Sequence, residues 1–411
     1  MVRYFTLFIA LFFCTFSAIA QTAEGCDGSR YIDDVFSEVV VTTSIEYATG
    51  VPTVSGGMTN LFMDIYEPAD DSQEKRPAIV LAHGGSFLFG ARGDMQSFCE
   101  TFARKGYVAI TMDYRLWPVL TQGFPDSTGI LGIVVGAVHD MKGAVRFLRA
   151  DAATTNTFKI DPEQILVGGL SAGGIIATHV GMMDETDDIP PHVQEIIDEV
   201  GLGLEGASGS MGYSSDIQGI LNLSGGLYLS SWVDSDDAPI LSMHGTSDET
   251  VPYNQGLAAG IMSINGSGNV HLKAEAAGIR NHLITVEGGG HTDIYTEAAF
   301  VDAQELLNTE GMAFLESLLC NLTSAKDIDA SIAVTIAPNP ATDIATVQVP
   351  NYTGTYDVLV YDQMGRLVNR QTNQGDSFVE LSKQTIGTGL FFVQIRLADG
   401  TGTIAKSVVF E

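Results

Sequence analysis

The sequence predicts an open, mostly parallel α/β sheet followed by a small all-β sandwich. From about residue 39 to residue 324, short apolar segments alternate with amphipathic helical segments. The apolar segments are continuous, which is typical of strands buried on both faces of a parallel sheet. The last ~80 residues have no helical period and carry short alternating segments between turn residues, as an antiparallel sandwich does.

The length and charge of the chain limit its class. A chain of 411 residues is too long for one ordinary domain, so we expect two folded units plus export signals. Hydrophobic residues make up 45% and charged residues 17%, a balance that supports a packed core. The 50 acidic and 20 basic residues give a net charge of -30, which argues against nucleic acid as a partner.

The first 20 residues have the pattern of a secretory signal peptide. Arg3 provides the positive charge, residues 7–16 form a short apolar stretch, and residues 18–20 (Ala-Ile-Ala) form a cleavage site before Gln21. The apolar run is too short for a membrane anchor, and no later segment has about 18 unbroken apolar residues. We therefore expect a secreted protein without stable membrane insertion.

Strands and intervening helices build the first predicted unit, residues 21–322. The strands are expected at 78–82, 108–112, 165–169, 220–223, 240–243 and 283–286. Helical segments lie at 98–105 and 138–150, and this alternation indicates helices on both faces of the sheet. Residues 184–215 form a cap-like insertion with an acidic run, two prolines, a short helix at 193–200 and a Gly/Ser-rich stretch. Such insertions build substrate pockets or lids, or are variable surface loops.

A nucleophile motif lies directly after the strand at 165–169. Residues 169–173 have the sequence Gly-Leu-Ser-Ala-Gly, and an apolar helical segment follows at 175–180. The glycines allow a tight strand–turn–helix connection in which flanking side chains would collide with neighbouring backbone. Ser171 is thereby predicted to be an exposed nucleophile, with the backbone N–H of Ala172 placed to stabilise an oxyanion.

The second half of an oxyanion hole is expected after the strand at 78–82. Residues 83–86 have the sequence His-Gly-Gly-Ser, and the glycines let backbone N–H groups approach a developing negative charge. Gly84 and Gly85 are the predicted donors, with Ser86 as a further candidate, whereas His83 is expected to have a structural, orienting role.

Two further motifs provide an acid and a base. Asp248 ends the sequence His-Gly-Thr-Ser-Asp after the strand at 240–243, and His291 follows three glycines after the strand at 283–286. Both lie after strands, in the order Ser, Asp, His that an open α/β sheet uses for nucleophilic catalysis. Ser171 is predicted to attack, His291 to shuttle the proton, and Asp248 to fix the imidazole tautomer.

Other polar residues receive structural interpretations. Asp293 is close to His291 in sequence, but a residue two positions away rarely orients that ring. His244 is expected to form structural hydrogen bonds. The remaining histidines have no metal-ligand spacing, and the acidic residues at 184–188 are interpreted as a solvated turn rather than a calcium site. We expect no metal and no cofactor.

The cysteines allow at most one internal disulfide. Signal cleavage leaves Cys26, Cys99 and Cys320, an odd number in an oxidising compartment. Cys99 is expected on an early helix and Cys320 at the end of the last helix, where a disulfide would join them. A bond between Cys26 and Cys320 is nearly as well supported, so the pairing stays open.

Taken together, these motifs resemble the α/β-hydrolase superfamily. The resemblance covers about residues 39–320 and is greatest to the carboxylesterase and lipase branch, including secreted feruloyl- and acetyl-esterase-like proteins. It implies hydrolysis of acyl esters through an acyl-enzyme without a cofactor. Ser86 departs from the pattern, since many esterases have a third glycine at this position.

The tail resembles the C-terminal sorting domain of type IX secretion. A linker at 323–334 is expected to precede this domain, which covers residues 335–411. The matching motifs are Ala-Pro-Asn-Pro-Ala at 337–341, Val-Tyr-Asp-Gln-Met-Gly at 360–365, Gly-Thr-Gly-Leu-Phe-Phe-Val at 387–393 and Lys-Ser-Val-Val at 406–409. The resemblance implies the outer-membrane secretion machinery as a partner and a secreted or cell-surface location.

A secreted carboxylic-ester hydrolase is the function that these expectations support best. Phe87, Trp117 and Trp232 lie near predicted loop ends on the catalytic side, where they would contact an apolar or aromatic acyl group. Acyl or feruloyl esters of polysaccharide would suit a secreted enzyme. The alternatives are a polyester hydrolase or lipase, a serine peptidase of the prolyl-oligopeptidase type and, least expected, a non-catalytic adhesion protein.

Overall fold

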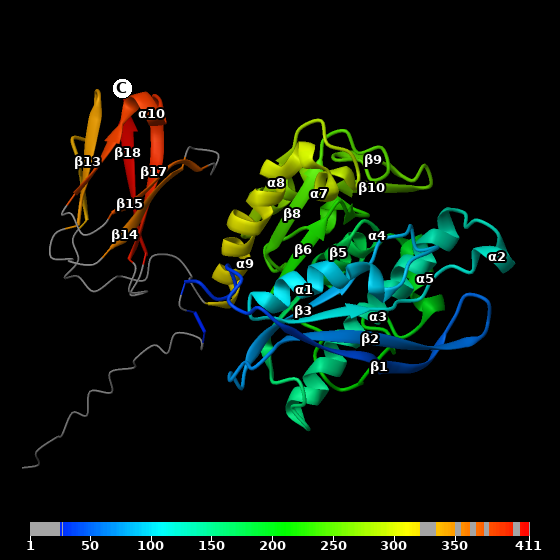
Figure 1. The fold of residues 1–411 in the computed structure, drawn as a ribbon. Helices are drawn as coiled ribbons and strands as arrows, with labels where there is room; N and C mark the ends of the chain where they lie inside the picture. Colours follow the sequence, from blue (N-terminus) through cyan, green and yellow to red (C-terminus); the bar gives the residue numbers. More distant parts are fainter. Residues whose placement is uncertain are drawn as a thin grey trace, which may run out of the picture.

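The computed structural model describes residues 25–26, 28–320, 334–349, 355–361, 367–373, 378–397 and 403–410. The predicted signal peptide (1–20) lies outside these residues, as does the predicted linker (323–334) except for its last residue. The first unit is coloured from blue to yellow in Figure 1, and the second from orange to red.

An eight-stranded sheet forms the centre of the first unit. From one edge to the other its strands are β1 (Val39–Pro52), β2 (Met58–Pro68), β4 (Val108–Met112), β3 (Arg76–Ala82), β5 (Ile160–Leu170), β6 (Gly219–Leu223), β8 (Ile240–Gly245) and β11 (Asn281–Val286). The six strands from β4 to β11 are parallel, and β2 pairs antiparallel with both β1 and β4. All six predicted strands are therefore confirmed as the parallel part of the sheet.

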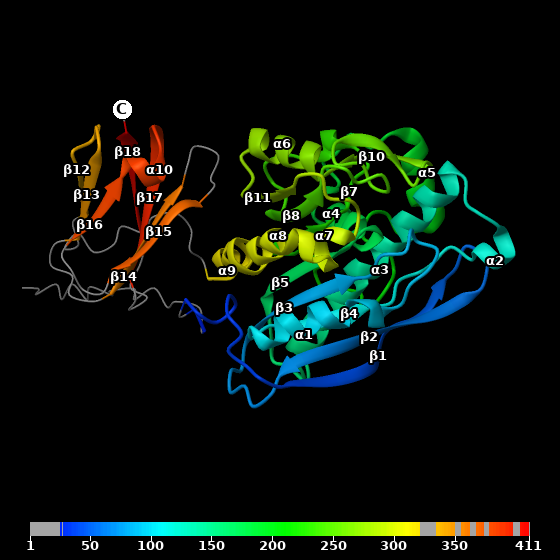
Figure 2. The ribbon, with the colours of Figure 1, turned by 45° about the horizontal axis from the view of Figure 1, so that its top comes forward.

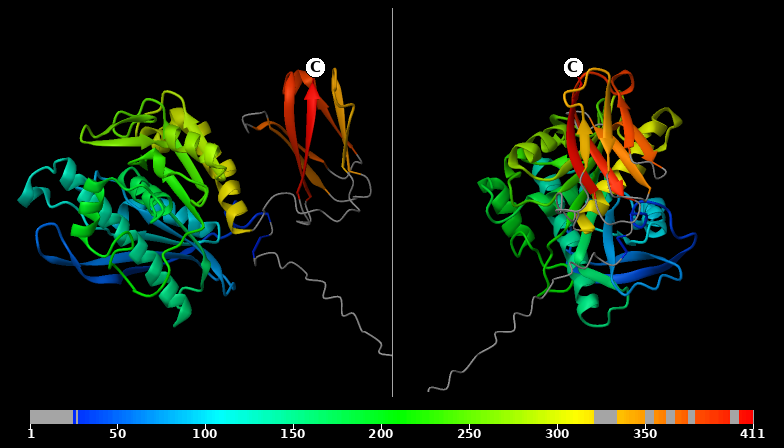
Figure 3. Two further views of the ribbon diagram at one scale, coloured as in Figure 1. Left: turned by 180° about the vertical axis from the view of Figure 1, so that it is seen from behind. Right: turned by 90° about the vertical axis from the view of Figure 1, so that its left-hand side faces the viewer.

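Helices cover both faces of this sheet. They are α1 (Gln96–Arg104), α2 (Val119–Gln122), α3 (Ser127–Ala153), α4 (Ala172–Met182), α5 (Pro191–Val200), α6 (Ser267–Ala277), α7 (Asp293–Thr296), α8 (Val301–Leu306) and α9 (Met312–Leu319), with the short turns η1 (Arg92–Met95), η2 (Ser230–Trp232), η3 (Ala298–Phe300) and η4 (Leu307–Gly311). A small sheet, β7 (Gly226–Leu227), β10 (Met262–Gly266) and β9 (Gln255–Ala258), lies outside the large one. The two helical layers can be followed in Figure 2 and, from behind, in Figure 3.

The alternation of side chains along the strands creates two hydrophobic cores. On β3, Ala78 and Val80 pack in the core that α3, α4 and α6 cover, whereas Ile79 and Leu81 pack in the core that α1 and α9 cover. Burial on both faces explains why these strands are continuously apolar. The edge strand β11 differs, because Ile284 and Val286 are its only buried residues; the expectation of burial on both faces is wrong there.

The helix predicted at 138–150 is the second half of the longer helix α3. Asp126 begins it, since its carboxylate accepts a hydrogen bond of 2.8 Å from the N–H of Gly129. Glycines in the first half of α3 lower its helix propensity and conceal this start in the sequence. By length and composition α3 could cross a membrane, but 78% of its most apolar window is buried inside the fold, which identifies it as a core helix.

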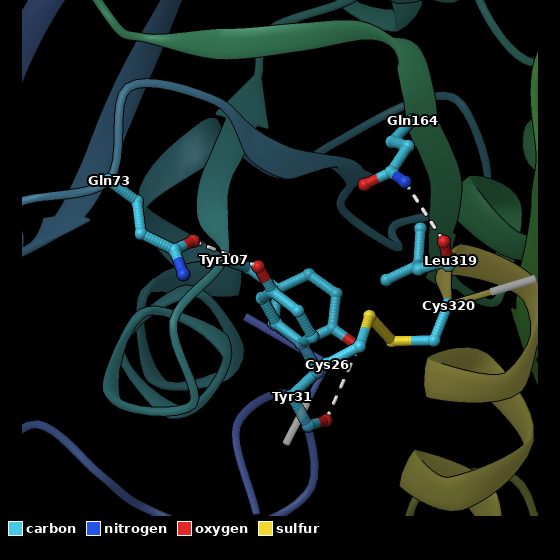
Figure 4. Close-up of a disulfide and its surroundings, with 7 residues drawn as sticks. All are labelled: Cys26, Tyr31, Gln73, Tyr107, Gln164, Leu319 and Cys320. Atoms are coloured by element: carbon cyan, nitrogen blue, oxygen red, sulfur yellow. Dashed lines mark hydrogen bonds between the residues drawn. A yellow bond between two sulfur atoms is a disulfide. The ribbon is translucent and has the colours of Figure 1, made fainter. Parts of the chain in front are cut away.

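A disulfide joins Cys26 to Cys320, with a Cα–Cα distance of 5.7 Å (Figure 4). Of the two pairings that the sequence left open, this is the one that forms, and Cys99 lies on the buried face of α1 as a free thiol. Cys26 belongs to an N-terminal segment that packs beside the end of α9, and in that segment the ring of Tyr31 contacts the ring of Tyr107 at 5.2 Å. The disulfide therefore ties the two ends of the first unit together.

The second unit is a sandwich of two antiparallel sheets, as predicted. One sheet contains β12 (Thr335–Ala337), β13 (Ile344–Gln348) and β16 (Phe378–Ser382), and the other contains β15 (Leu367–Asn373), β14 (Tyr356–Tyr361), β17 (Gly389–Leu397) and β18 (Thr403–Phe410), with the short helix α10 (Lys383–Ile386). Val347, Val360 and Val393 are fully buried in one common core, so the two sheets face each other.

Candidate active site

Ser171 occupies a strained turn between β5 and α4. Its backbone has φ 58° and ψ −114°, a conformation that non-glycine residues rarely adopt. Such backbone strain is found mainly at functional sites. A side chain at either Gly169 or Gly173 would collide with the carbonyl oxygen of Ala82, which explains the two glycines of the motif. The N–H of Ser171 donates a hydrogen bond of 2.8 Å to Leu223 O, which fixes the turn on β6.

Ser171, His291 and Asp248 form a continuous hydrogen-bonded row. His291 Nε2 lies 2.7 Å from Ser171 Oγ, and His291 Nδ1 lies 2.7 Å from Asp248 Oδ2. The three side chains follow β5, β11 and β8, whose parallel pairing brings their carboxyl ends to one edge of the sheet. The three residues expected to act together from their order in the sequence thus lie within hydrogen-bond distance of one another.

Asp248 is held as a carboxylate by several donors. Its Oδ1 accepts the backbone N–H groups of Thr250 (2.8 Å) and Val251 (2.9 Å), while Oδ2 lies 2.7 Å from His291 and 3.2 Å from His244. Burial alone would raise the pKa of Asp248, but the hydrogen bonds with the two histidines and with the backbone outweigh it and hold this pKa well below its usual range. Asp248 is therefore ionised at any pH at which the imidazole of His291 can accept a proton.

Asp293, the other acid near His291, has a separate structural task. Its carboxylate accepts hydrogen bonds from the N–H of Gly290 (2.9 Å) and from its own neighbour Ile294 (2.8 Å). No hydrogen bond among the described residues joins it to the His291 ring. Asp293 shapes the glycine turn that presents His291, and Asp248 is the acid of the row.

The loop at residues 83–87, called the oxyanion loop because its backbone is predicted to form part of an oxyanion hole, lies directly against Ser171. A Cβ at Gly84 would be 3.3 Å from Ser171 Cβ, and Gly85 has φ +117°, which only glycine adopts without strain. Ser86 follows with φ 55°, so the residue that replaces the third glycine of many esterases carries backbone strain. Among the described residues, no hydrogen bond uses the backbone N–H of Gly84, Gly85 or Ala172 as its donor. These three amides remain able to donate to an oxyanion.

His83 and Tyr114 support this loop from beneath. His83 Nδ1 lies 2.6 Å from Gly84 O, Tyr114 Oη donates to His83 O at 2.9 Å, and the two rings stack at 4.4 Å. Burial lowers the pKa of His83, which keeps the imidazole neutral. These contacts agree with the orienting role expected for His83. No sequence pattern pointed to Tyr114.

The aromatic residues proposed for the substrate pocket are mostly covered. Phe87 is 3% exposed and packs against Tyr114, and Trp232 is 2% exposed beside His179. Large apolar rings at loop ends gain more by packing into the core than by facing water, so neither offers a broad surface to a substrate. Trp117 is half-buried, and its indole N–H donates to Gly123 O at 2.8 Å.

The insertion at 184–215 packs firmly on α3. Val193, Ile196 and Ile197 of α5 are buried against it, and a small apolar cavity lies between α3, α4, α5 and Trp232. Further along, Glu205 forms ion pairs with Lys142 (2.7 Å) and Arg146 (3.1 Å) of α3. Through these contacts residues 193–205 cover part of α3.

Two acidic turns carry interacting charges, one at residues 184–187 at the start of this insertion and the other at residues 234–237. In each turn a carboxylate accepts a backbone N–H, Asp187 from Asp184 (2.9 Å) and Asp237 from Asp234 (2.8 Å). Partial burial, reinforced by the neighbouring aspartates, raises the pKa of Asp187 to about 6 and that of Asp237 to about 7. In the first turn, which was interpreted as solvated, Glu185 and Asp188 are exposed and Asp184 and Asp187 are partly buried.

These raised pKa values predict a pH-dependent stability. A carboxyl group with a higher pKa in the folded state favours folding below its unfolded pKa of about 4, and this contribution is lost as the pH rises through about 6 to 7. Asp237→Asn keeps an oxygen for the Asp234 N–H but removes the charge. We expect a higher Tm than wild type at about pH 8 and the same Tm at about pH 4. Thermal unfolding at both values tests this, and an equal gain from the exposed neighbour variant Asp236→Asn would contradict it.

Two known families match the chain. The family described as BD-FAE matches residues 63–225, which contain the oxyanion loop and the Ser171 turn. The family described as secretion system C-terminal sorting domain matches residues 335–411. Esterase-5B of Drosophila persimilis is 31% identical over 132 residues, or 31% of this chain and 22% of that protein. Esterase-5A of the same species is 32% identical over 143 residues, which are 34% of this chain and 24% of that protein. The chain therefore spans about a quarter of the length of these relatives.

Solved structures with a similar fold include two esterases. A propionate-bound thermophilic esterase from Thermogutta terrifontis is 22% identical, with 68% of this chain and 94% of that chain covered and a TM-score of 0.47. A truncated carbohydrate esterase from gut microbiota is 19% identical, with 69% of this chain and 98% of that chain covered and a TM-score of 0.48.

The sheet order, the strained serine turn and the family matches define the class of the first unit as an α/β-hydrolase. More particularly, residues 63–225 of the first unit match the BD-FAE family, part of the chain is similar to part of the Drosophila esterases, and residues 335–411 match the secretion system C-terminal sorting domain. Such a domain indicates a secreted or cell-surface protein.

Proposed function

We propose that the protein is a secreted serine carboxylesterase that cleaves acyl esters through an acyl-enzyme. The observation that carries this proposal is the hydrogen-bonded row from Ser171 Oγ through His291 to Asp248, 2.7 Å at each step. The geometry fits a nucleophile, a general base and an orienting carboxylate. Three backbone amides without a hydrogen-bond acceptor among the described residues lie on the loops beside the nucleophile.

In the acylation step, His291 Nε2 takes the proton from Ser171 Oγ as the oxygen attacks the ester carbonyl carbon. The carbonyl oxygen becomes an oxyanion, and the amides of Gly84, Gly85 and Ala172 donate to it. Such preorganised donors are worth about 3–4 kcal/mol each in the transition state. The imidazolium then returns its proton to the leaving alkoxide, which leaves an ester on Ser171.

In the deacylation step, the roles repeat with water. His291 removes a proton from a water molecule, which attacks the acyl carbon, and then returns that proton to Ser171 Oγ. The acid product leaves and the enzyme is restored. Asp248 keeps the proton of His291 on Nδ1 throughout, so that Nε2 remains the acceptor.

Acyl or feruloyl esters of polysaccharide are the substrates that we propose first. A secreted protein with an esterase-like site and without a nucleic-acid or membrane partner meets such material outside the cell. We also propose that the signal peptide at 1–20 directs the first export step, and that the outer-membrane secretion machinery recognises the tail.

A polyester hydrolase or lipase is the second candidate, favoured by exposed apolar residues near the site. Leu120 is 98% exposed and Phe124 is 75% exposed on the segment that contains α2. The same segment is joined to the oxyanion loop, since the Trp117 N–H donates to Phe87 O at 2.8 Å. An exposed apolar tip beside a catalytic loop fits an apolar acyl chain or an insoluble polymer.

A hydrolysis panel tests the function and separates the two candidates. We expect release of p-nitrophenol from p-nitrophenyl acetate and labelling by a fluorophosphonate probe, both absent in Ser171→Ala. Methyl ferulate and acetylated xylan as good substrates would support the polysaccharide candidate, whereas a preference for long acyl esters or polyester film would support the second. Wild-type protein that neither hydrolyses any ester nor reacts with the probe would refute the proposal.

A further inference from the structure

Asp248 Oδ2 lies between two imidazoles rather than beside one. His291 Nδ1 is 2.7 Å away and His244 Nε2 is 3.2 Å away. His244 Nε2 also lies 2.9 Å from the carbonyl oxygen of Val251. A carboxylate and a carbonyl oxygen both accept hydrogen bonds, so His244 Nε2 must carry a hydrogen that these two oxygens share.

The other nitrogen of His244 continues a buried polar chain. His244 Nδ1 lies 2.8 Å from Ser267 Oγ, and Asn222 Nδ2 donates to the same hydroxyl at 3.1 Å. The side chains of His244, Ser267 and Asn222 are all fully buried. The Asn222 amide nitrogen can only donate to the Ser267 hydroxyl, and His244 Nδ1 is the other partner of that hydroxyl among the described residues, so Ser267 donates its own hydrogen to Nδ1. The donors thus all point from Asn222 through Ser267 and His244 toward Asp248.

A second branch starts from the same asparagine. Asn222 Nδ2 donates to Ser242 Oγ at 3.1 Å, and that hydroxyl lies 2.9 Å from His271 Nε2. His271 Nδ1 lies 3.0 Å from Asn281 Oδ1, an acceptor. Nδ1 of His271 therefore carries the hydrogen and Nε2 accepts from Ser242. Burial lowers the pKa of His271 to about 4, in keeping with a neutral ring.

Asn222 also contacts the nucleophile turn. Its Oδ1 accepts the N–H of Gly225 at 2.9 Å, and a Cβ at Gly174 of α4 would lie 2.7 Å from the same oxygen. The next residue along β6, Leu223, accepts the N–H of Ser171 through its carbonyl oxygen. One buried side chain therefore touches the helix that carries the nucleophile and begins the chain of donors that ends on the acid.

We propose that His244, Ser267 and Asn222 are positioning residues that hold Asp248 in register with Ser171 and limit how strongly its carboxylate attracts His291. This proposal rests on the serine-esterase function proposed above. Oδ2 divides its charge between two N–H donors, so His291 receives a weaker acceptor than an unshared carboxylate would give. When every donor in a chain of hydrogen bonds points the same way, the bonds polarise and strengthen one another. Such a chain allows the side chains in it, including Asp248, to move little.

The proposal predicts effects on both rate and pH dependence. Ser267→Ala removes the hydroxyl that fixes His244, and we expect fluorophosphonate labelling to slow about 10-fold. His244→Leu removes the second donor, so the acid limb of the labelling-rate profile should move to higher pH by about 0.5–1 unit. In His244→Gln, the amide nitrogen can donate where Nε2 did, and the limb should stay near its wild-type position.

Other titratable groups near this pair are unchanged in these variants. They are Asp293 and Tyr295 of α7, and Tyr253, whose ring lies edge-on to His244 at 5.6 Å. The matched control is Ser208→Ala, which removes a buried hydroxyl that donates to Asp140 at 2.6 Å in a cluster separate from this network. We expect it to lower stability but to leave the labelling rate and its pH profile unchanged.

The decisive experiment combines labelling with proton NMR of the His291 Nδ1 hydrogen in the full chain. A low-field signal that shifts in His244→Leu and Ser267→Ala, but not in Ser208→Ala, supports the proposal. Identical rates, profiles and signals in wild type and His244→Leu would overturn it while the esterase function stands. Wild-type protein that is never labelled would instead overturn the proposed function, and the NMR comparison would still decide the network.

Discussion

Replacing Asp248 with asparagine is expected to lower kcat about 10⁴-fold with little change in KM. The two backbone N–H groups of Thr250 and Val251 require an oxygen at the Oδ1 position, at 2.8 and 2.9 Å. The amide NH₂ would then occupy the Oδ2 position and face His291 Nδ1 as a donor. The imidazole would have to place its hydrogen on Nε2, where it can no longer accept the proton of Ser171.

The same substitution also disturbs His244. Its Nε2–H lies 3.2 Å from Oδ2 and would meet a second donor instead of a carboxylate, so the acid loop should lose stability as well as function. Steady-state kinetics on p-nitrophenyl acetate measure the loss. Asp293→Asn is the matched control, because its remaining oxygen can still accept the N–H of Gly290, and we expect less than about a 10-fold change. Similar losses in the two variants would argue against Asp248 as the orienting acid.

The site was predictable because its motifs are local and the sheet topology orders them. Ser171 lies in a pentapeptide with glycines at 169 and 173, where any larger residue would collide with the carbonyl oxygen of Ala82. Asp248 and His291 each follow a strand that is apolar along most of its length. Parallel pairing then leaves one edge of the sheet where all three can meet. No long-range packing detail is needed to reach that conclusion.

Of the polar network behind Asp248, only the structural hydrogen bonds of His244 were predicted, although the sequence also contains a sign of its other members. Asn222 interrupts an apolar strand, and Ser242 and His244 alternate along the next, so that they share one face. A polar residue in a strand buried on both faces requires a partner. The identity of that partner depends on α6, which supplies Ser267 from a part of the chain without a motif.

Packing also decides features that the sequence does not specify. Phe87 and Trp232 were predicted from their positions in the sequence to contact the substrate; both side chains are buried in the core, and their part in substrate binding stays a prediction. Strands β1 and β2 were missed because exposed residues interrupt β1, and polar residues such as Asp64 and Glu67 interrupt the apolar pattern of the largely buried β2. Cys99 could be placed on a helix, yet its orientation toward the core depends on which face of α1 packs on the sheet.

Removal of the Cys26–Cys320 disulfide is expected to have the largest effect on stability. The bond closes a loop with a sequence separation of 294 residues, and long loops gain the most from closure because the unfolded chain loses the most freedom. We expect Cys26→Ser/Cys320→Ser to lower the free energy of unfolding by about 2–5 kcal/mol and Tm by roughly 5–15 °C. Thermal unfolding of the full chain with and without reductant measures this effect.

The structure also indicates where the loss should begin. The disulfide ties the end of α9 to the N-terminal segment. That segment is also bonded to the α1 side of the fold, where Arg30 pairs with Asp71 and the Tyr31 N–H donates to Lys105 O, whereas the end of α9 accepts a hydrogen bond of 2.9 Å from Gln164 at Leu319 O (Figure 4). Hydrogen exchange in the variant should therefore rise first in α9 and around residue 31, ahead of the central strands. Ser171, Asp248 and His291 directly follow central strands of the sheet, so we expect the folded variant to keep its esterase activity at low temperature.

Cys99 provides the control for this prediction. Burial raises the pKa of its thiol, so it remains protonated and cannot readily replace either partner in the bond. Cys99→Ala should lower Tm only by the cost of its small cavity and should keep the wild-type sensitivity to reductant, whereas the double variant should have none. A wild-type Tm that is the same with and without reductant would show that packing at the two ends holds the unit closed without the bond. The N-terminal segment and α9 would then owe their position to the contacts of Tyr31 and Leu319 in the core rather than to the disulfide.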